Sequence, residues 1–164
     1  MPARCAFALQ QLTTTLMTQI NFYTVSEEGI DARIRFACRL IDKAWNLGHR
    51  VFIQTESTAQ AKHLDDMLWQ YKTTSFVPHC RLHEPLADPP HKNTGAESVV
   101  ISTELPDASH DDVLINLSAA TQAQHLRFAR INEIVAADPT SLEQGRVRYR
   151  FYKAQGHQPI THKL

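Results

Sequence analysis

Short apolar runs alternate with longer amphipathic stretches along the first half of the chain. Residues 20–25 (INFYTV) and 49–55 (HRVFIQT) are rich in β-branched and aromatic side chains, a composition typical of strands. Residues 31–47 and 58–71 follow these runs and repeat apolar residues at helical spacing. The order strand, helix, strand, helix indicates parallel strands joined by helical connections.

The second half of the chain continues with shorter apolar runs. Val99–Thr103, Val113–Leu117 and Ile131–Val135 are predicted strands. Four prolines between residues 73 and 93 exclude a regular helix there and favour a short strand followed by a loop. These runs bring the number of predicted strands to six.

The last helix has a clear predicted start at Asp138-Pro139. The aspartate side chain can cap free backbone amides, and proline fixes the first helical turn. This helix is expected to run to Gly156. Together the elements predict an α/β protein with a three-layer, Rossmann-like fold, in which a mostly parallel sheet carries helices on both faces.

Length and composition narrow the class of protein. The 164 residues predict a single domain over residues 17–164, preceded by a flexible extension at residues 1–16, because the strand pattern begins just after Met17. Seventeen basic and seventeen acidic residues balance, which argues against non-specific binding to DNA or anionic lipid. No apolar segment is long enough to span a membrane. Three cysteines without C-x-x-C spacing favour a reducing cytoplasm.

The chain lacks the motifs of phosphate-binding and hydrolytic enzymes. The turn after the first predicted strand, residues 26–29 (SEEG), places two carboxylates where a phosphate would sit, and no GxGxxG or GxxxxGK motif occurs. There is no G-x-S-x-G elbow, and Cys38 lies in an apolar context expected to raise its pKa. We therefore expect a binding protein without catalytic residues. A small nucleotide-binding protein or enzyme with an unrecognised site remains the alternative.

Four histidine and cysteine residues in the middle of the chain are candidate metal ligands. They are His79, Cys80, His83 and His91. Their spacing is loose, and Pro78 and Pro85 prevent the helical geometry that would direct two histidines at one ion. We predict neither a metal nor a cofactor.

The last helix carries a basic and aromatic face. Three cations and one phenol share this face: Arg146, Tyr149, Arg150 and Lys153. The neighbouring apolar stripe, Val147, Phe151 and Ala154, is predicted to dock the helix on the sheet. Guanidinium groups grip carboxylates in pairs of hydrogen bonds and the ring offers a flat wall, which suits an acidic peptide terminus. A solvated charged face and a nucleic-acid site are the alternatives.

Trp69 and Phe76 form a second candidate site. Trp69 falls near the end of its predicted helix, and Phe76 lies in a polar segment. Large aromatic side chains are usually core residues, but near the boundary of an element they are also suitable anchors for a protein interface.

Six motifs spread over almost the whole chain carry a resemblance to a known family. They are NFYTV, KAWNLGHRVFIQT, LDDMLW, SFVPH, DVLINL and GRVRYRFYKAQG. From about Met17 to its end the chain resembles the chi subunit of bacterial DNA polymerase III holoenzyme. The resemblance implies a Rossmann-like fold without enzymatic activity, in the clamp-loader assembly of the cytoplasm. It also implies that DNA is contacted only indirectly.

The resemblance implies two protein partners and their sites. The acidic C-terminal tail of single-stranded DNA-binding protein is expected on Arg146, Tyr149 and Arg150, with Val135 lining the apolar part. The psi subunit is expected on the surface of Trp69 and Phe76, for which the resemblance also suggests a helicase-like protein as a partner. The family often has a lysine where this chain has Leu142, so one contact to a carboxylate is missing, and Lys153 is the expected substitute.

Overall fold

A computed structural model describes residues 17–72, 76–82, 99–105, 112–121 and 123–164. The predicted extension at residues 1–16 lies outside these ranges, as do His83 and His91 of the candidate metal ligands.

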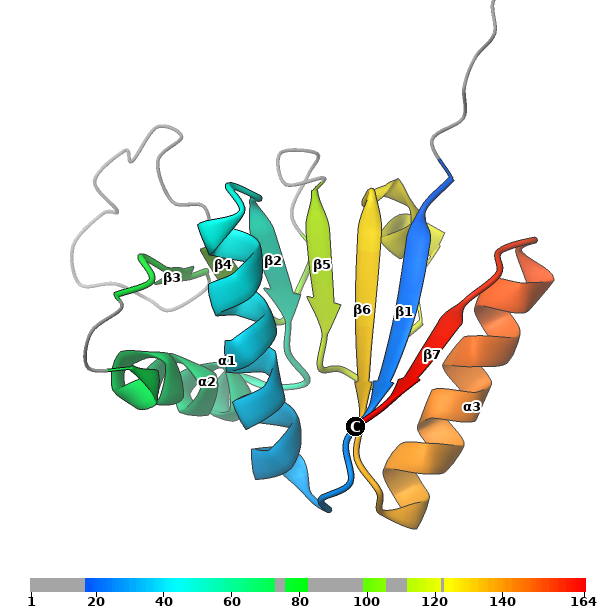
Figure 1. Ribbon diagram of the computed structural model, residues 1–164, viewed down its shortest axis with the longest axis horizontal. Helices are drawn as coiled ribbons and strands as arrows, with labels where there is room; N and C mark the ends of the chain where they lie inside the picture. Colours follow the sequence, from blue (N-terminus) through cyan, green and yellow to red (C-terminus); the bar gives the residue numbers. More distant parts are fainter. Residues whose placement is uncertain (1–16, 73–75, 83–98, 106–111, 122) are drawn as a thin grey trace, which may run out of the picture.

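Seven parallel strands form one sheet, in the order β3-β4-β2-β5-β6-β1-β7 (Figure 1). The bounds of the strands are β1 Gln19–Thr24, β2 Val51–Gln54, β3 Cys80–Arg81, β4 Val99–Ser102, β5 Val113–Asn116, β6 Arg130–Val135 and β7 Ile160–Lys163. The predicted strands at residues 20–25, 49–55, 99–103, 113–117 and 131–135 are thus confirmed. Because the strands are parallel, their carboxyl ends lie at one edge of the sheet.

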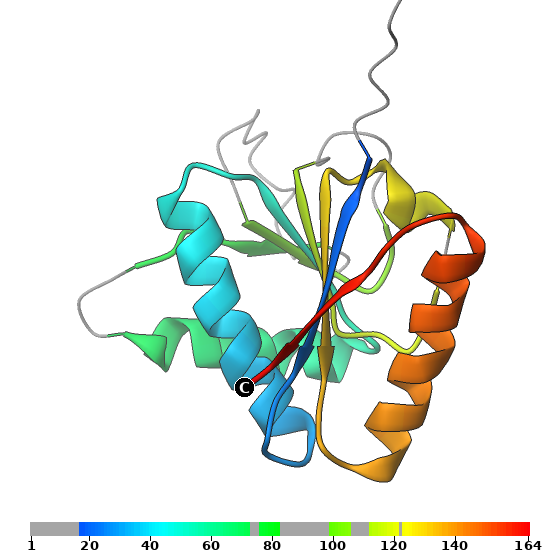
Figure 2. The same cartoon turned by 45° about the vertical axis from the view of Figure 1, so that its right-hand side comes forward.

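Helices cover both faces of the sheet, which confirms the predicted three-layer α/β arrangement (Figure 2). The helices α1 (Ile30–Asn46) and α2 (Thr58–Tyr71) pack on one face. The helix α3 (Pro139–Ala154) and the short 3₁₀ helix η1 (Ala123–Arg127) contribute to the core on the other face. In the described ranges, no helix has the length and apolar character needed to cross a membrane.

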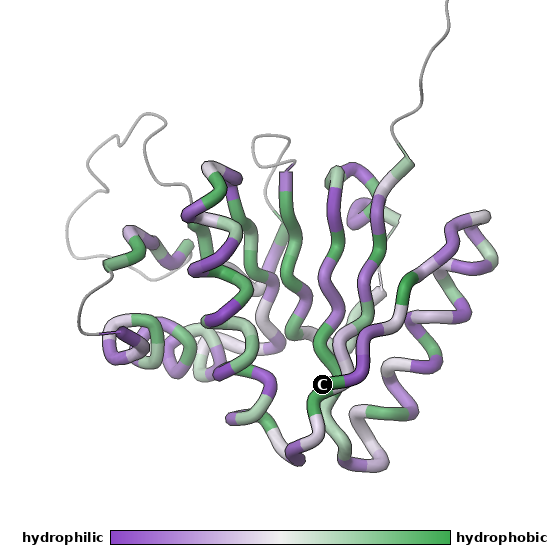
Figure 3. Tube along the Cα trace, viewed as in Figure 1, coloured by the Kyte–Doolittle hydropathy of each residue, from purple (hydrophilic) through white to green (hydrophobic). Residues whose placement is uncertain are grey.

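The strand sequences explain why both faces are buried. In β2, Val51 and Ile53 point towards α1 and α2, whereas Phe52 points to the α3 face, because successive side chains alternate across a sheet. All three side chains are inaccessible to solvent. Continuous apolar runs of this kind are typical of parallel sheets covered on both sides. Figure 3 shows this hydrophobic character in β2 and β5, whereas α3 is mostly hydrophilic.

The start of α3 follows its sequence signal. The Asp138 carboxylate accepts a hydrogen bond of 2.8 Å from the backbone amide of Ser141, and Pro139 occupies the first turn. This capping bond lowers the pKa of Asp138 below its ordinary value. The predicted helix start is therefore confirmed.

The predicted docking face of α3 was wrong for Val147 and Ala154, whereas Phe151 is partly buried and packs against the core as predicted. Val147 is 51% exposed and Ala154 is also exposed, while the buried residues of the helix are Gly145, Arg148 and Tyr152. Arg148 was not predicted on the inner face, because a buried arginine needs a charged partner. That partner, Glu133, lies on β6. β7 was also not predicted, since its sequence ITHK is short, polar and largely exposed.

Candidate functional site

The candidate site lies where α3 packs over the carboxyl ends of β6 and β1 and beside β7. A cavity of about 150 Å³ opens there. It is lined by Phe22, Thr24, Val135, Leu142, Gly145, Arg146, Tyr149 and Thr161. Three residues predicted for the tail site, Val135, Arg146 and Tyr149, are therefore brought together around one cavity.

A glycine allows α3 to approach the sheet closely at this point. A Cβ atom added to Gly145 would lie 2.9 Å from Cγ2 and 3.2 Å from Cγ1 of Val135. These separations are below the 3.5–4.0 Å that carbon atoms prefer. Any larger residue at position 145 would push against Val135, so Gly145 sets the distance between α3 and β6 and, with it, the width of the cavity.

The apolar part of the cavity rests on an aromatic contact between α3 and the first strand. The ring of Tyr149 lies edge-on to that of Phe22, with 5.4 Å between the centroids. This geometry is favourable for aromatic pairs and adds to the burial of both rings. Leu142 also packs against this cluster, so position 142 contributes apolar surface here.

The rim of the cavity is basic and exposed. The side chains of Arg146 and Arg150 are 68% and 71% exposed, and both pair with Glu143, at 3.2 Å and 3.4 Å. Nε of Arg150 also donates to the backbone oxygen of Arg146 at 3.4 Å. Exposed ion pairs of this kind contribute little to stability. The Glu143 carboxylate thus bridges the two guanidinium groups.

The fifth residue predicted for the tail site lies further along the helix. Nζ of Lys153 donates a hydrogen bond of 2.9 Å to Oε1 of Gln158, in the connection that follows α3. Neither Lys153 nor Arg150 lines the cavity. The structure therefore places Arg150 on the rim and Lys153 one turn beyond Tyr149, away from the apolar part of the site.

A buried polar network connects α3 to the sheet. Oε2 of Glu133 on β6 accepts a hydrogen bond of 2.8 Å from Nε of Arg148, and its Oε1 accepts one of 2.8 Å from the Tyr152 hydroxyl. Asn116 on β5 donates to both carboxylate oxygens, at 3.1 Å and 3.2 Å. Glu133 and Tyr152 are inaccessible to solvent, and Arg148 is 2% exposed. These bonds fix the rotation of α3 about its axis, and hence the direction of the cavity-lining side chains.

The network continues to η1 and β2. Nε2 of His125 lies 2.7 Å from Oε1 of Gln54, and its Nδ1 lies 3.3 Å from the Tyr152 hydroxyl. Burial lowers the pKa of His125, because desolvation disfavours the charged ring. Burial also raises the pKa of Tyr152, and the charge of Glu133 adds to this effect. At neutral pH both groups are uncharged, so Arg148 and Glu133 provide the balanced charges of the network.

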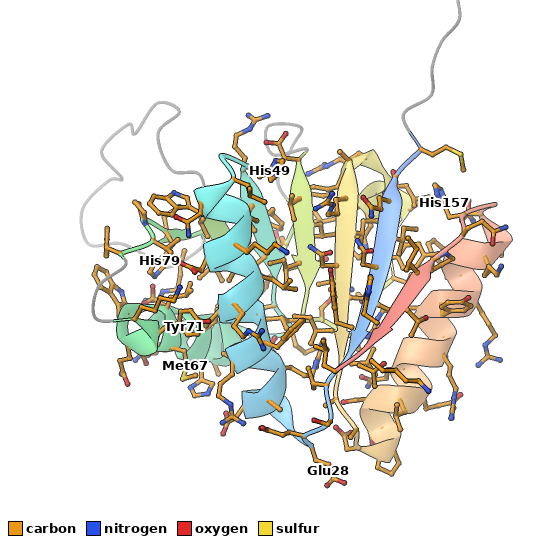
Figure 4. The ribbon with its side chains drawn as sticks, viewed as in Figure 1. Glu28, His49, Met67, Tyr71, His79 and His157 are labelled. Carbon is orange, nitrogen blue, oxygen red and sulfur yellow. The ribbon has the colours of Figure 1, made fainter. Side chains whose placement is uncertain are left out.

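The second candidate site lies at the other end of the sheet, on and after α2 (Figure 1). Trp69 and Phe76 are 60% and 57% exposed, and their ring centroids are 5.0 Å apart. His79, labelled in Figure 4, stacks obliquely on Trp69 at 5.5 Å and hydrogen-bonds to Asp65 at 2.9 Å. The pair is therefore an exposed aromatic patch supported from below, and the core interpretation of these residues was wrong.

Two residues outside the candidate sites, Glu27 and Cys38, have structural roles. Glu27, in the turn after β1, forms an ion pair with Arg35 of α1. Burial raises the pKa of the Cys38 thiol to about 12, as expected of a packed side chain. In the part of the chain that the structure describes, no group of three metal-ligating side chains comes together.

The fold and the site together define a parallel α/β protein with a small apolar cavity and a basic rim on its last helix. A family model described as the DNA polymerase III chi subunit, HolC, matches residues 17–160. The DNA polymerase III subunit chi of Pseudomonas aeruginosa is 32% identical over 148 residues, which cover 90% of this chain and 98% of that protein. The Escherichia coli subunit is 26% identical over 144 residues, covering 85% and 94%. The chain therefore belongs to the chi-subunit family of DNA polymerase III.

A solved structure of another kind shares the fold. The crystal structure of T4 UvsW superposes with a TM-score of 0.63 and 9% identity, over 93% of this chain and 42% of that chain. At this identity the likeness shows the α/β fold alone. Membership of the chi family, by contrast, implies that other subunits of DNA polymerase III are partners of this chain.

Proposed function

We propose that this chain is a non-catalytic adaptor of DNA polymerase III that binds the acidic C-terminal tail of single-stranded DNA-binding protein. The tail binds at the cavity and its basic rim on α3. The psi subunit binds the exposed patch of Trp69 and Phe76 and connects the chain to the clamp loader. The adaptor acts in the cytoplasm and contacts DNA only through its partners.

The observation that carries the proposal is an apolar cavity beside an exposed guanidinium pair. A cavity of about 150 Å³ holds one benzene-sized group. A peptide that ends in an apolar side chain can place it between Val135 and Tyr149, while its carboxylates reach Arg146 at the rim. Such a ligand combines burial of an apolar anchor with charge-assisted hydrogen bonds.

The contacts of Glu143 favour a carboxylate ligand over the phosphates of a nucleic acid. Its two carboxylate oxygens bridge Arg146 and Arg150, so the guanidinium groups already hold the chemical group that the tail supplies. Exchange of one carboxylate for another requires no rearrangement of α3. We expect Glu143→Gln to strengthen tail binding modestly, because it weakens this internal competition.

The test of the tail site is a calorimetric titration with a synthetic acidic tail peptide. Arg146→Ala and Tyr149→Ala should each weaken binding by about 1 to 3 kcal/mol, through loss of a charged hydrogen bond or of a buried anchor. Arg39→Ala is the matched control, because Arg39 is an exposed arginine on α1 that stacks on Phe36, far from α3. Unchanged affinity of both site variants would contradict the proposal.

The psi surface is tested separately by co-purification. A Trp69→Ala/Phe76→Ala double variant should lose psi but retain the tail peptide, because the two sites lie at opposite ends of the sheet. The double variant should fold, since both side chains are more than half exposed. If the double variant still co-purifies with psi, Trp69 and Phe76 are not part of the psi interface.

A further inference from the structure

The last strand brings a lysine to the cavity side of the sheet. β7 pairs in parallel with β1, and Lys163 lies opposite Thr24, while Thr161 lies opposite Phe22. Phe22, Thr24 and Thr161 all line the cavity. Because alternate residues of a strand point to the same face, Lys163 shares the face of Thr161.

The residue between them confirms this alternation. The His162 ring stacks on Tyr23 with 4.7 Å between the centroids, and its Nε2 lies 3.2 Å from Oδ1 of Asn21. Tyr23 also contacts Phe36 of α1, at 5.2 Å, so His162 points to the opposite face of the sheet from the cavity. Lys163 is therefore directed to the α3 side.

The charge of Lys163 is available to a ligand. Its side chain is exposed, and within the described ranges no carboxylate lies within ion-pair distance of it. Arg146 on α3 lines the cavity, and Lys163 on β7 lies in register with Thr24, which also lines it. A ligand whose apolar end fills the cavity meets a cation on either side.

We propose that Lys163 is a binding residue of the tail site and that the ligand lies between α3 and β7. The ligand is then an extended acidic peptide with at least two carboxylates near its apolar end, one held by Arg146 and another by Lys163. This inference rests on the proposed tail-binding function. It also supplies the cation that the leucine at position 142 does not provide.

The experiment is a titration of the full chain with the same acidic tail peptide. Lys163→Ala should weaken binding by roughly two- to five-fold, as for other exposed charge contacts, and Lys163→Glu by about ten-fold or more. Both effects should shrink at high salt. Lys43→Glu is the matched control for net charge, because Lys43 is an exposed lysine on α1, on the other face of the sheet.

A peptide series identifies the contact itself. In this series each acidic residue of the peptide is replaced in turn by its amide. For the residue that contacts Lys163, the replacement should reduce the binding free energy less in Lys163→Ala than in the parent chain. Circular dichroism of each variant checks that the overall fold persists. If Lys163→Glu binds like the parent while Arg146→Ala is impaired, this inference is overturned and the tail site stands. If the parent chain does not bind the peptide, both fail.

Discussion

Gly145 offers the sharpest test of how the site is built. Gly145→Ala places a methyl group 2.9 Å from Cγ2 of Val135, so the two side chains must separate by about 0.5 to 1 Å to reach an ordinary contact. Overpacking of this kind costs about 1 to 3 kcal/mol. Alanine favours the helix over glycine by about 1 kcal/mol. The balance is a net loss of about 0 to 2 kcal/mol in the free energy of unfolding.

The cause of that loss is isolated by a second substitution. Val135→Ala alone removes both Cγ atoms from a buried site and should cost roughly 2 kcal/mol. In the Gly145→Ala/Val135→Ala chain the new methyl group enters the space left by valine. The double variant should therefore be more stable than the sum of the single effects by about 1 to 3 kcal/mol.

Urea unfolding followed by circular dichroism measures these free energies. Val147→Ala, on the exposed face of the same helix, is the control and should change stability by less than about 0.5 kcal/mol. Tail binding should weaken in Gly145→Ala, because Gly145 and Val135 both line the cavity and the added methyl group displaces them from their present positions. Additivity of the two single variants to within about 0.5 kcal/mol would refute the close approach of α3 to β6.

Three further predictions concern buried groups. Arg148→Met should cost about 3 to 5 kcal/mol in urea unfolding, because it removes the cation that is bonded to the buried Glu133 carboxylate, and Glu133→Gln in the same chain should restore part of the loss. Burial lowers the pKa of His125, so the unfolded chain takes up its proton first, and stability should fall as the pH drops below about 6.5. Urea midpoints at pH 7.5 and 5.5 should differ less in His125→Asn. In a Cys5→Ser/Cys80→Ser chain, Cys38 should react with a thiol reagent at pH 8 only after urea is added, since its pKa is about 12; a fast reaction of the folded chain would contradict its burial.

The sequence predicted the strands and the start of α3 because their signals are local. Apolar runs such as VLIN and the Asp138-Pro139 pair depend only on neighbouring residues. The exposed aromatic patch could also be predicted from the sequence, because Phe76 follows a polar segment. These features need no knowledge of which elements meet in space.

The docking of α3 could not be predicted in the same way. Arg148 is buried only because Glu133 faces it from a strand fifteen residues earlier, and neither residue alone signals the pair. A carboxylate inside the apolar run INEIV was the one available hint. The role of Gly145 likewise depends on its contact with Val135, which lies on β6. The role of β7 depends on its pairing register with β1. Sequence periodicity therefore pointed to Val147 as an inner residue, while long-range contacts decided the actual face.

The pairing of β1 with β7 has a consequence for truncated chains. Among the described strands, β1 precedes all the others in the sequence and β7 follows them, so one edge of β1 is covered only by the most C-terminal described strand. A chain interrupted before residue 160 would leave the edge of β1 open to pairing with other chains. It would also lack Thr161 and Lys163 beside the cavity. We therefore expect a chain truncated before residue 160 to bind the proposed tail peptide more weakly than the parent chain, which would make peptide affinity a measure of proteolytic damage in a preparation.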